Sequence, residues 1–189
     1  MSSVSTNEIR VGMKVEVDKE PYLIIGNEFV KPGKGQAFNR IKMKNMINGR
    51  VVERTYKSGE KIDLADIEEA KMRFLYKESD GSVFMDEKTF DQISISNELI
   101  GNNQQWLMEE VVYDVVFYKG APIELVPPTF MEMVITDTSP GVRGDTSGRV
   151  LKPAVTETGA KIQIPIFVEQ GEKIKVDTRT GEYVSRASS

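Results

Sequence analysis

The chain has 189 residues, of which 39% are hydrophobic and 29% are charged, an ordinary composition for a protein that folds in water. It contains no cysteine and no histidine, which excludes disulfides, cysteine nucleophiles, imidazole metal ligands and the commonest general base. We therefore expect no catalytic residue, no metal site and no enzymatic activity. The sequence has no apolar stretch long enough to cross a membrane and no signal peptide pattern at its start, so we expect a cytoplasmic protein without a membrane partner.

The net charge of −4 hides an uneven distribution along the chain. Residues 1–64 hold 12 bases and 8 acids, residues 65–128 hold 5 bases and 13 acids, and residues 129–189 hold 8 of each. An acidic protein does not coat nucleic acid nonspecifically, but a basic first segment can meet phosphate locally. This asymmetry predicts a directional contact with RNA.

The first segment, residues 1–64, has the pattern of a small all-β domain. Residues 13–17 alternate between polar and apolar, residues 22–30 and 37–45 are typical of strands, and Asn48-Gly49 is a strong hairpin turn before a strand over residues 51–57. Four or five short strands without helical periodicity predict an SH3-like barrel.

A turn rich in glycine separates the two longer strands of this segment. It consists of Lys31, Pro32, Gly33, Lys34, Gly35 and Gln36. Pro32 fixes its own φ, and the two glycines permit backbone angles that are closed to other residues, so we expect a hairpin tip. Lys34 stands between two residues without side chains, where it can enter a narrow cavity or be grasped by a modifying enzyme. A solvated turn lysine is the alternative, whereas Glu28 and Gly35 break the pattern of a phosphate-binding P-loop.

The hairpin that carries this tip is strongly basic. Residues 31–57 contain eight bases against one acid, Glu53. We expect Arg40 and Lys42 on the returning strand to contact RNA phosphates.

The second segment, residues 65–128, begins after a polar connector and ends at Pro127-Pro128, which cannot donate in a ladder. Strands are predicted over residues 71–76, 82–85, 92–96, 111–118 and 123–126. Residues 97–109 are typical of one or two helical turns with a break at Gly101. Trp106 fits a core or interface residue better than a base-stacking platform, because the segment is acidic.

The third segment, residues 129–189, predicts strands over residues 130–136, 150–155, 161–168, 173–177 and 183–187. Short strands at regular spacing predict an OB-type barrel here and in the second segment. The loop before residue 150 contains Gly144, Asp145 and Thr146, whose amides and side chains can bind base edges or ribose hydroxyls. Tyr183 and Arg186 on the last strand can contact an RNA backbone, and strand packing with a solvated charge is the alternative.

Three stretches resemble one family. Residues 28–38, EFVKPGKGQAF, look like the lysine-bearing tip of bacterial translation elongation factor P. Residues 152–171 are similar to that family's C-terminal pattern, with Ile164 where valine is usual, and residues 171–186 match as well. The resemblance therefore covers essentially the whole chain.

The resemblance implies three consecutive small β-barrels, an SH3-like or KOW-like barrel over residues 1–64 and two OB barrels over residues 65–128 and 129–189, in an elongated L shape. It implies a monomer that binds both ribosomal subunits between the peptidyl and exit sites. There it would promote peptide bonds at consecutive prolines by positioning the peptidyl-site tRNA. Residues 144–146 would face the messenger RNA codon in the exit site.

The resemblance also implies that Lys34 reaches the peptidyl-transferase centre and carries a β-lysyl group added by a lysine-modifying enzyme, with no other cofactor. Two alternatives stay open at this point. One is a diverged paralogue of the factor with other clients, and the other is an OB-fold RNA-binding protein or chaperone. The archaeal and eukaryotic relative, initiation factor five A, has only two domains, so the third barrel favours the bacterial type.

Overall fold

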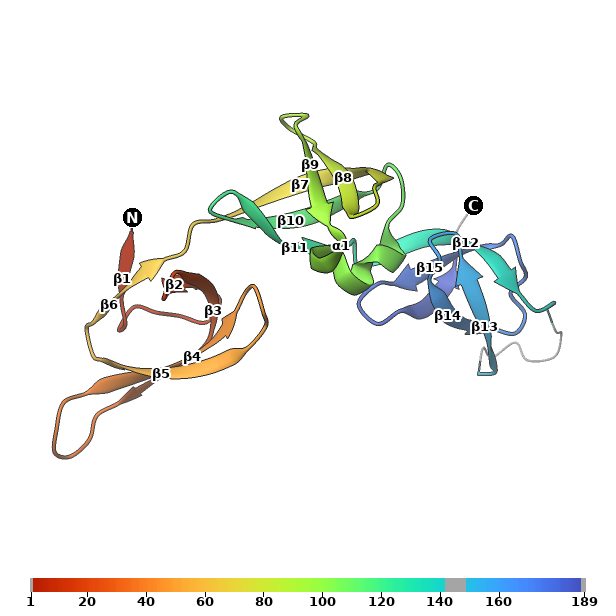
Figure 1. Cartoon of the computed structure of the whole chain (residues 1–189). Helices are drawn as coiled ribbons and strands as arrows, with labels where there is room; N and C mark the ends of the chain where they lie inside the picture. Colours follow the sequence, from red (N-terminus) through yellow and green to blue (C-terminus); the bar gives the residue numbers. More distant parts are fainter. Residues whose placement is uncertain (1, 142–148, 188–189) are drawn as a thin grey trace. The chain divides into compact units, whose positions relative to one another are not determined.

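The structure, a computed structural model, describes residues 2–141 and 149–187 and is built of strands in three sheets (Figure 1). The expected all-β fold class is confirmed. One sheet has six strands, in the order β1-β6-β2-β3-β4-β5. The other two have five strands each, in the orders β11-β10-β7-β8-β9 and β14-β13-β12-β15-β16. In both smaller sheets the first strand is central, followed on one side by the second and third strands and on the other by the fourth and fifth.

The chain forms two compact units. The first comprises Met1–Ala70 and Val115–Glu124, and the second comprises Lys71–Asp114 and Leu125–Ser189. Each unit therefore combines one complete sheet with part of the middle sheet. The division into three domains at residues 64 and 128 stays a prediction.

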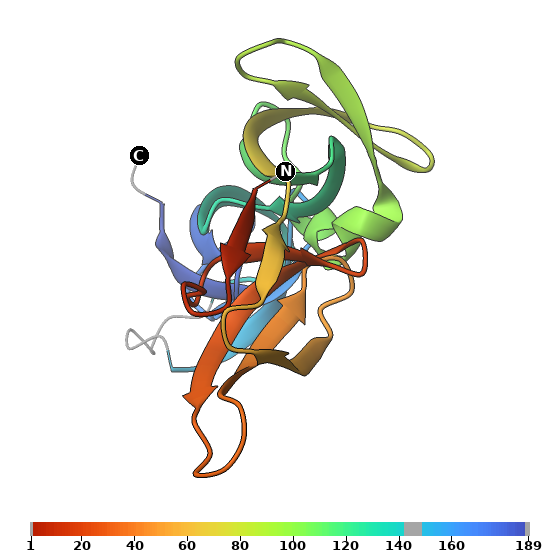
Figure 2. The same ribbon diagram turned by 90° about the vertical axis from the view of Figure 1, so that its left-hand side faces the viewer.

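The six-stranded sheet lies in the first unit (Figure 2). Its strands are β1 (Ser3–Ser5), β2 (Lys14–Val17), β3 (Glu20–Val30), β4 (Phe38–Asn45), β5 (Val51–Lys57) and β6 (Lys61–Leu64). The four strands expected between residues 13 and 57 are present. The short strands β1 and β6 were not expected, and they pair with each other from opposite ends of the segment, with Val4 opposite Ile62.

Strand β4 shows why one face of this sheet is buried. Buried and exposed residues alternate strictly from Asn39 to Asn45, because successive side chains of a strand point to opposite faces. Ile41 and Met43 are fully buried and pack with Val15, Tyr22 and Ile24 in the core of the unit. Arg40, Lys42 and Lys44 occupy the outer face.

The middle sheet consists of β7 (Ile67–Lys77), β8 (Gly81–Asp86), β9 (Gln92–Ser96), β10 (Val112–Tyr118) and β11 (Ala121–Val126). The expected helical turns follow β9 as α1 (Asn97–Ile100) and a 3₁₀ helix over Gly101–Trp106. The Ser96 side chain caps α1 by accepting from the Leu99 amide at 3.2 Å. The helix changes type at Gly101, which has a φ of 54°.

The third sheet consists of β12 (Phe130–Thr138), β13 (Leu151–Thr156), β14 (Lys161–Pro165), β15 (Lys173–Asp177) and β16 (Glu182–Arg186). The strand expected over residues 161–168 ends earlier, at Pro165. The reason is a turn in which the Val168 amide donates to the Pro165 carbonyl at 3.1 Å.

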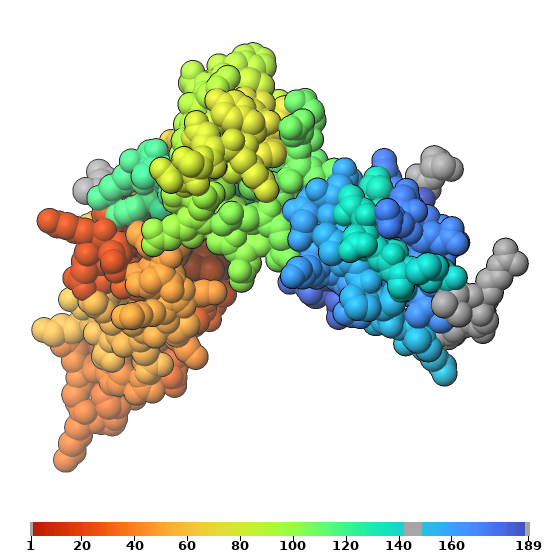
Figure 3. Space-filling model, turned by 45° about the vertical axis from the view of Figure 1, so that its right-hand side comes forward, coloured from red at the N-terminus to blue at the C-terminus, as the bar shows by residue number. Residues whose placement is uncertain are grey.

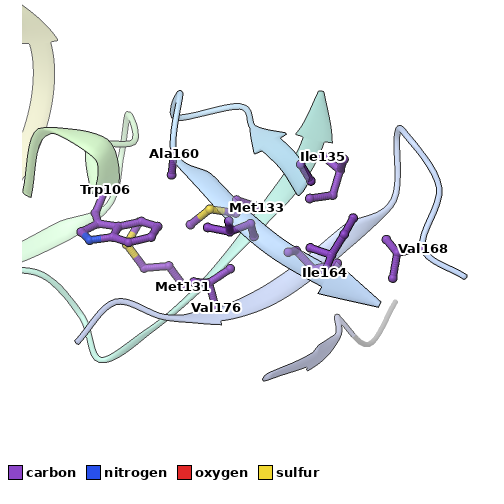
Figure 4. Close-up of a cluster of buried hydrophobic side chains, with 11 residues drawn as sticks. Trp106, Met131, Met133, Ile135, Ala160, Ile164, Val168 and Val176 are labelled. Atoms are coloured by element: carbon purple, nitrogen blue, oxygen red, sulfur yellow. The ribbon is translucent and has the colours of Figure 1, made fainter. Parts of the chain in front are cut away.

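Trp106 belongs to the core of the second unit (Figure 4). Its side chain is 2% exposed and lies in one cluster with Met131 and Met133 of β12. The backbone of the turn is fixed by Tyr113, whose hydroxyl donates to the Trp106 carbonyl at 2.5 Å and accepts from the Met108 amide at 2.9 Å. Burial raises the pKa of the Tyr113 phenol to about 12. Trp106 is thus a core residue, as its acidic surroundings predicted.

A carboxylate at the edge of the first unit receives two donors. Glu16 on β2 accepts from the Tyr118 hydroxyl, and its Oε1 lies 2.6 Å from the Lys119 ammonium. The hydrogen bond from Lys119, helped by the one from Tyr118, lowers the pKa of Glu16 from its ordinary 4.5. This contact ties the turn between β10 and β11 to the six-stranded sheet.

We predict that Glu16→Gln reduces the acid sensitivity of the first unit. Because the Glu16 pKa is lower in the folded chain, its ionised form stabilises the fold above about pH 4.5, and this contribution is lost as the pH falls through the folded pKa. The variant should melt below the wild type at neutral pH, and the difference should shrink below pH 4.5. Melting curves between pH 3 and 7 test this, with the exposed Glu8→Gln as control. A constant difference across that range would contradict it.

Candidate functional site

The hairpin of β3 and β4 carries the candidate site at its tip. The two strands pair from Tyr22 opposite Asn45 to Val30 opposite Phe38, with a bulge between Ile24 and Gly26. Strand β5 runs along β4 as far as Lys57 opposite Phe38. The hairpin therefore has three-stranded support up to residue 38, and only the turn itself extends beyond.

The turn holds Lys34 in the open. In the space-filling view the chain narrows here to a thin projection (Figure 3). Lys34 is exposed, as are Gly33 and Gly35 beside it. Within residues 2–141 and 149–187, the Lys34 side chain makes no hydrogen bond or ion pair. Its ammonium is free to meet a partner.

The two glycines of the turn differ in their backbone conformation. Gly35 has a φ of 112°, in the region that residues with a side chain rarely adopt. Gly33 is not among the residues with positive φ, and a methyl group built there would meet nothing within 4 Å. The backbone freedom that both glycines permit is therefore used for a positive φ at Gly35 and not at Gly33. A methyl group at Gly33 would have room.

The remaining turn residues frame this lysine. Lys31 is exposed and Pro32 is half-buried, with its Cγ 3.7 Å from the position that a Cβ on Gly35 would take. At the end of the turn, the Ala37 carbonyl accepts from the Ser58 amide at 3.1 Å. The turn is thus anchored on the side of β5.

The basic residues of the arm fall into two groups. Arg40 lies between two carboxylates, 3.4 Å from Glu28 and 3.6 Å from Glu53. Arg54 lies 2.5 Å from Asp18, and this hydrogen bond raises the pKa of the guanidinium. In the part of the chain that the structure describes, the other six bases of residues 31–57 form no ion pair. They are Lys31, Lys34, Lys42, Lys44, Arg50 and Lys57.

This grouping refines the two expected phosphate contacts. Lys42 lies exposed on the outer face of β4, opposite Glu53 in the ladder, and forms no ion pair with the described residues. Arg40 shares that face, but a phosphate would have to compete with Glu28 and Glu53 for its guanidinium. A count of charges along the chain could not show that Glu28 and Glu53 both lie beside Arg40.

A second candidate site, Gly144, Asp145 and Thr146, lies outside the described residues. Both sides of this loop are nevertheless anchored. The Thr138 hydroxyl donates to the Pro153 carbonyl at 2.9 Å, and the buried Lys152 ammonium donates to the Ser139 carbonyl at 2.5 Å. Lys152 is 6% exposed, which sequence reasoning did not anticipate for a lysine.

Tyr183 and Arg186 lie on β16, opposite Val176 and Ile174. Tyr183 is half-buried against the core of the second unit, and burial raises the pKa of its phenol. It lines an open depression of about 1160 Å³ together with Thr138 of β12 and Gln163 of β14. Arg186 stacks over the Phe167 ring at 4.7 Å, with its Nε 3.4 Å from Glu172. Both side chains have structural partners, and their contact with RNA stays a prediction.

Among residues 2–141 and 149–187, no group of three or more carboxylates is placed to hold a metal ion. No helix in these ranges has the length and apolarity needed to span a membrane.

Three family models match the chain. They describe the elongation factor P KOW-like domain over residues 5–62, the elongation factor P OB domain over residues 67–125 and the elongation factor P C-terminal domain over residues 131–186. The matches leave only short connecting segments and the ends of the chain uncovered.

Full-length relatives agree with these models. The chain is 72% identical to "Elongation factor P 2" of Protochlamydia amoebophila and 60% identical to "Elongation factor P 2" of Chlamydia caviae, with complete coverage of both chains in each case. Its fold is similar to a solved structure of eukaryotic translation initiation factor 5A from Methanococcus jannaschii. That match has a TM-score of 0.57 and 21% identity, and covers 67% of this chain and 94% of the other. The chain therefore belongs to the bacterial elongation factor P family.

Proposed function

We propose that this translation elongation factor binds the ribosome between the peptidyl and exit sites and stimulates peptide-bond formation at consecutive prolines. The observation that carries the proposal is the exposed, unpaired Lys34 at the end of a supported hairpin. In this proposal Lys34 reaches toward the peptidyl-transferase centre. The chain offers no histidine or cysteine for chemistry of its own, so the ribosome carries out the reaction.

The proposed mechanism is catalysis by positioning. Holding reactants in a productive geometry can supply several kcal/mol of a reaction barrier, on the order of 7–11 kcal/mol in well-oriented cases. The outer face of β4 would hold the peptidyl-site tRNA through its phosphates, with Lys42 as the free contact and Arg40 as the shared one. Lys34 would then favour a reactive arrangement of a stalled prolyl end.

Further parts of the proposal concern the rest of the chain. We assign residues 1–64, 65–128 and 129–189 to three domains, a division supported by the limits of the three matching family models. Gly144, Asp145 and Thr146 would face the messenger RNA codon in the exit site, and Tyr183 and Arg186 would contact RNA nearby. The protein would act in the cytoplasm as a monomer and without enzymatic activity.

Lys34 is also the proposed modification site. A lysine-modifying enzyme would attach a β-lysyl group to its ε-amine, which would lengthen the side chain and add hydrogen-bond donors. The exposure of Lys34 and of the glycines on both sides of it supports such access. No other cofactor is proposed.

A second candidate is a paralogue of the factor with other clients. Both relatives described above carry the name "Elongation factor P 2". The numeral distinguishes them from another factor of the same name, which supports this alternative. A general RNA chaperone is disfavoured because residues 65–128 contain 13 acids and 5 bases.

We predict that Lys34→Ala removes most of the activity. In a reconstituted translation system, a reporter containing Pro-Pro-Pro should be rescued by the protein purified from its host and at least about tenfold less by the variant, because the reaching group is lost. Lys31→Ala, which removes an exposed lysine from the same turn, is the matched control and should retain most of the activity. If the wild type binds ribosomes but rescues nothing, the paralogue reading replaces the proline function.

We predict that the two glycines differ in their effect on the modification. Gly35→Ala forces a side chain into a positive φ, so the turn should distort and the occupancy of the Lys34 adduct should fall. Gly33→Ala meets no atom within 4 Å and should leave the occupancy near that of the wild type. Mass spectrometry of the Lys34 peptide from the native host measures both. A wild-type peptide without any adduct would refute the modification.

We predict that Lys42 contributes a salt-dependent contact. Removing one phosphate contact should reduce the slope of log binding constant against log salt concentration by about 1 for binding to ribosomes that carry a peptidyl-site tRNA. Lys42→Ala should show this change, whereas Lys88→Ala, an exposed lysine of the acidic segment, should not. Equal changes in the two variants would indicate a net-charge effect in place of a local contact.

A further inference from the structure

Two amide side chains, one buried and one half-buried, lie at the base of the tip hairpin. Asn39 is 2% exposed and occupies the core face of β4 in series with Ile41 and Met43. Its Nδ2 donates to the Oδ1 of Asn27 on β3 at 3.0 Å. The Nδ2 of Asn27 in turn donates to the carbonyls of Thr6 and Ile9, at 3.1 Å and 3.0 Å.

Thr6 extends this chain of hydrogen bonds to β5. The Thr6 hydroxyl is completely buried, donates to the Lys57 carbonyl at 3.3 Å and accepts from the Gly59 amide at 3.0 Å. Lys57 lies opposite Phe38, the residue before Asn39. The contacts therefore form a chain of hydrogen bonds that joins β3, β4 and the end of β5 at the base of the tip hairpin.

The polar residues at this position have a cost that apolar residues would avoid. The Oδ1 of Asn39 is buried, and no donor for it exists in the described part of the chain. Leaving a buried acceptor unpaired costs about 1–3 kcal/mol, whereas an apolar pair of similar shape is nearly neutral. Stability alone would favour valine or leucine in series with Ile41. What the amides add is direction, because hydrogen bonds require a narrow geometry and apolar contacts do not.

A loosely held hairpin would be able to swing at this point. The bulge between Ile24 and Gly26 interrupts the β3–β4 ladder directly before Asn27, and a bulge bends its strand. The bend needs a fixed angle if the tip is to stay in place. The Asn27 amide supplies it by tying the strand beyond the bulge to the loop that contains Thr6 and Ile9.

We infer that Asn27 and Asn39 are positioning residues, which set the direction of the tip hairpin and thereby the place where Lys34 is held. The geometric part of this inference stands on this chain of hydrogen bonds and on the bulge beside it. Its importance for translation rests on the proposed function.

Distance measurements between two spin labels test the geometric part. The chain contains no cysteine, so Gln36→Cys and Lys61→Cys place nitroxides on the exposed tip and on exposed β6 of the same unit. With Asn39→Val added, the distance distribution should broaden or shift beyond the width seen without it. The melting temperature should change only modestly, because the variant removes the unpaired Oδ1 of Asn39 but also takes the donor away from the half-buried Oδ1 of Asn27.

Asn45→Val is the matched control. Asn45 lies on the same strand and face, is also 2% exposed, and binds the Ile47 and Asn48 amides and the Glu20 carboxylate at the other end of β4. This variant should lose stability and leave the label distances unchanged. An unchanged distribution in folded Asn39→Val, or an equal change in Asn45→Val, would overturn the inference.

Two further measurements keep the test decisive. If Asn39→Val does not fold, the double variant Asn27→Val with Asn39→Val replaces both amides, so neither is left without its hydrogen-bond partner. The same distance criterion applies to the double variant. In the Pro-Pro-Pro reporter, Asn39→Val should lower rescue by roughly tenfold, as expected for a small misplacement of a reacting group. Failure of the wild type to rescue would refute the proposed function, while the label distances would still decide the positioning role.

Discussion

The position of the lysine-bearing turn depends on the ladder between β3 and β4. A two-stranded hairpin is marginally stable in water on its own, yet here the pairing continues to Val30 and Phe38 at the edge of the turn. Strand β5 makes this possible, because it supplies a third strand along β4 as far as Phe38. The unsupported length is thereby reduced to one short turn. A lysine at its end is exposed and held at a defined distance from the barrel at the same time.

The positive charge of β4 is concentrated on one face of the strand. The alternation of β4 sends Arg40, Lys42 and Lys44 to one face and the core residues to the other. Glu28 and Glu53 neutralise Arg40 on that face, so the positive charge that remains lies mainly with lysines. Lysine ammonium groups are compact, flexible point charges. They suit contacts with a phosphate backbone, where position matters more than a fixed bidentate geometry.

Much of this arrangement was accessible from the sequence. The period of two in residues 38–45, the Asn48-Gly49 turn and the proline and glycines around Lys34 predict the hairpin and its tip. The short strands β1 and β6 were not predictable, because three and four residues with a single buried side chain in β6 carry almost no local signal. They exist because residues at opposite ends of the segment pair, and such long-range contacts leave no pattern within a sequence window.

The polar residues inside the sheet show a different limit of sequence reasoning. Asn39 stands at a position where the alternation calls for an apolar residue, and this mismatch was the signal that could have been noticed. Its partner Asn27 could not be identified in the same way, because the bulge shifts the register of β3 by one residue. Holding a projecting hairpin in one direction requires fixed angles as well as contacts. A polar residue at a position where the pattern predicts an apolar one is therefore a place to look for a fixed angle. There, directional hydrogen bonds replace non-directional apolar contacts.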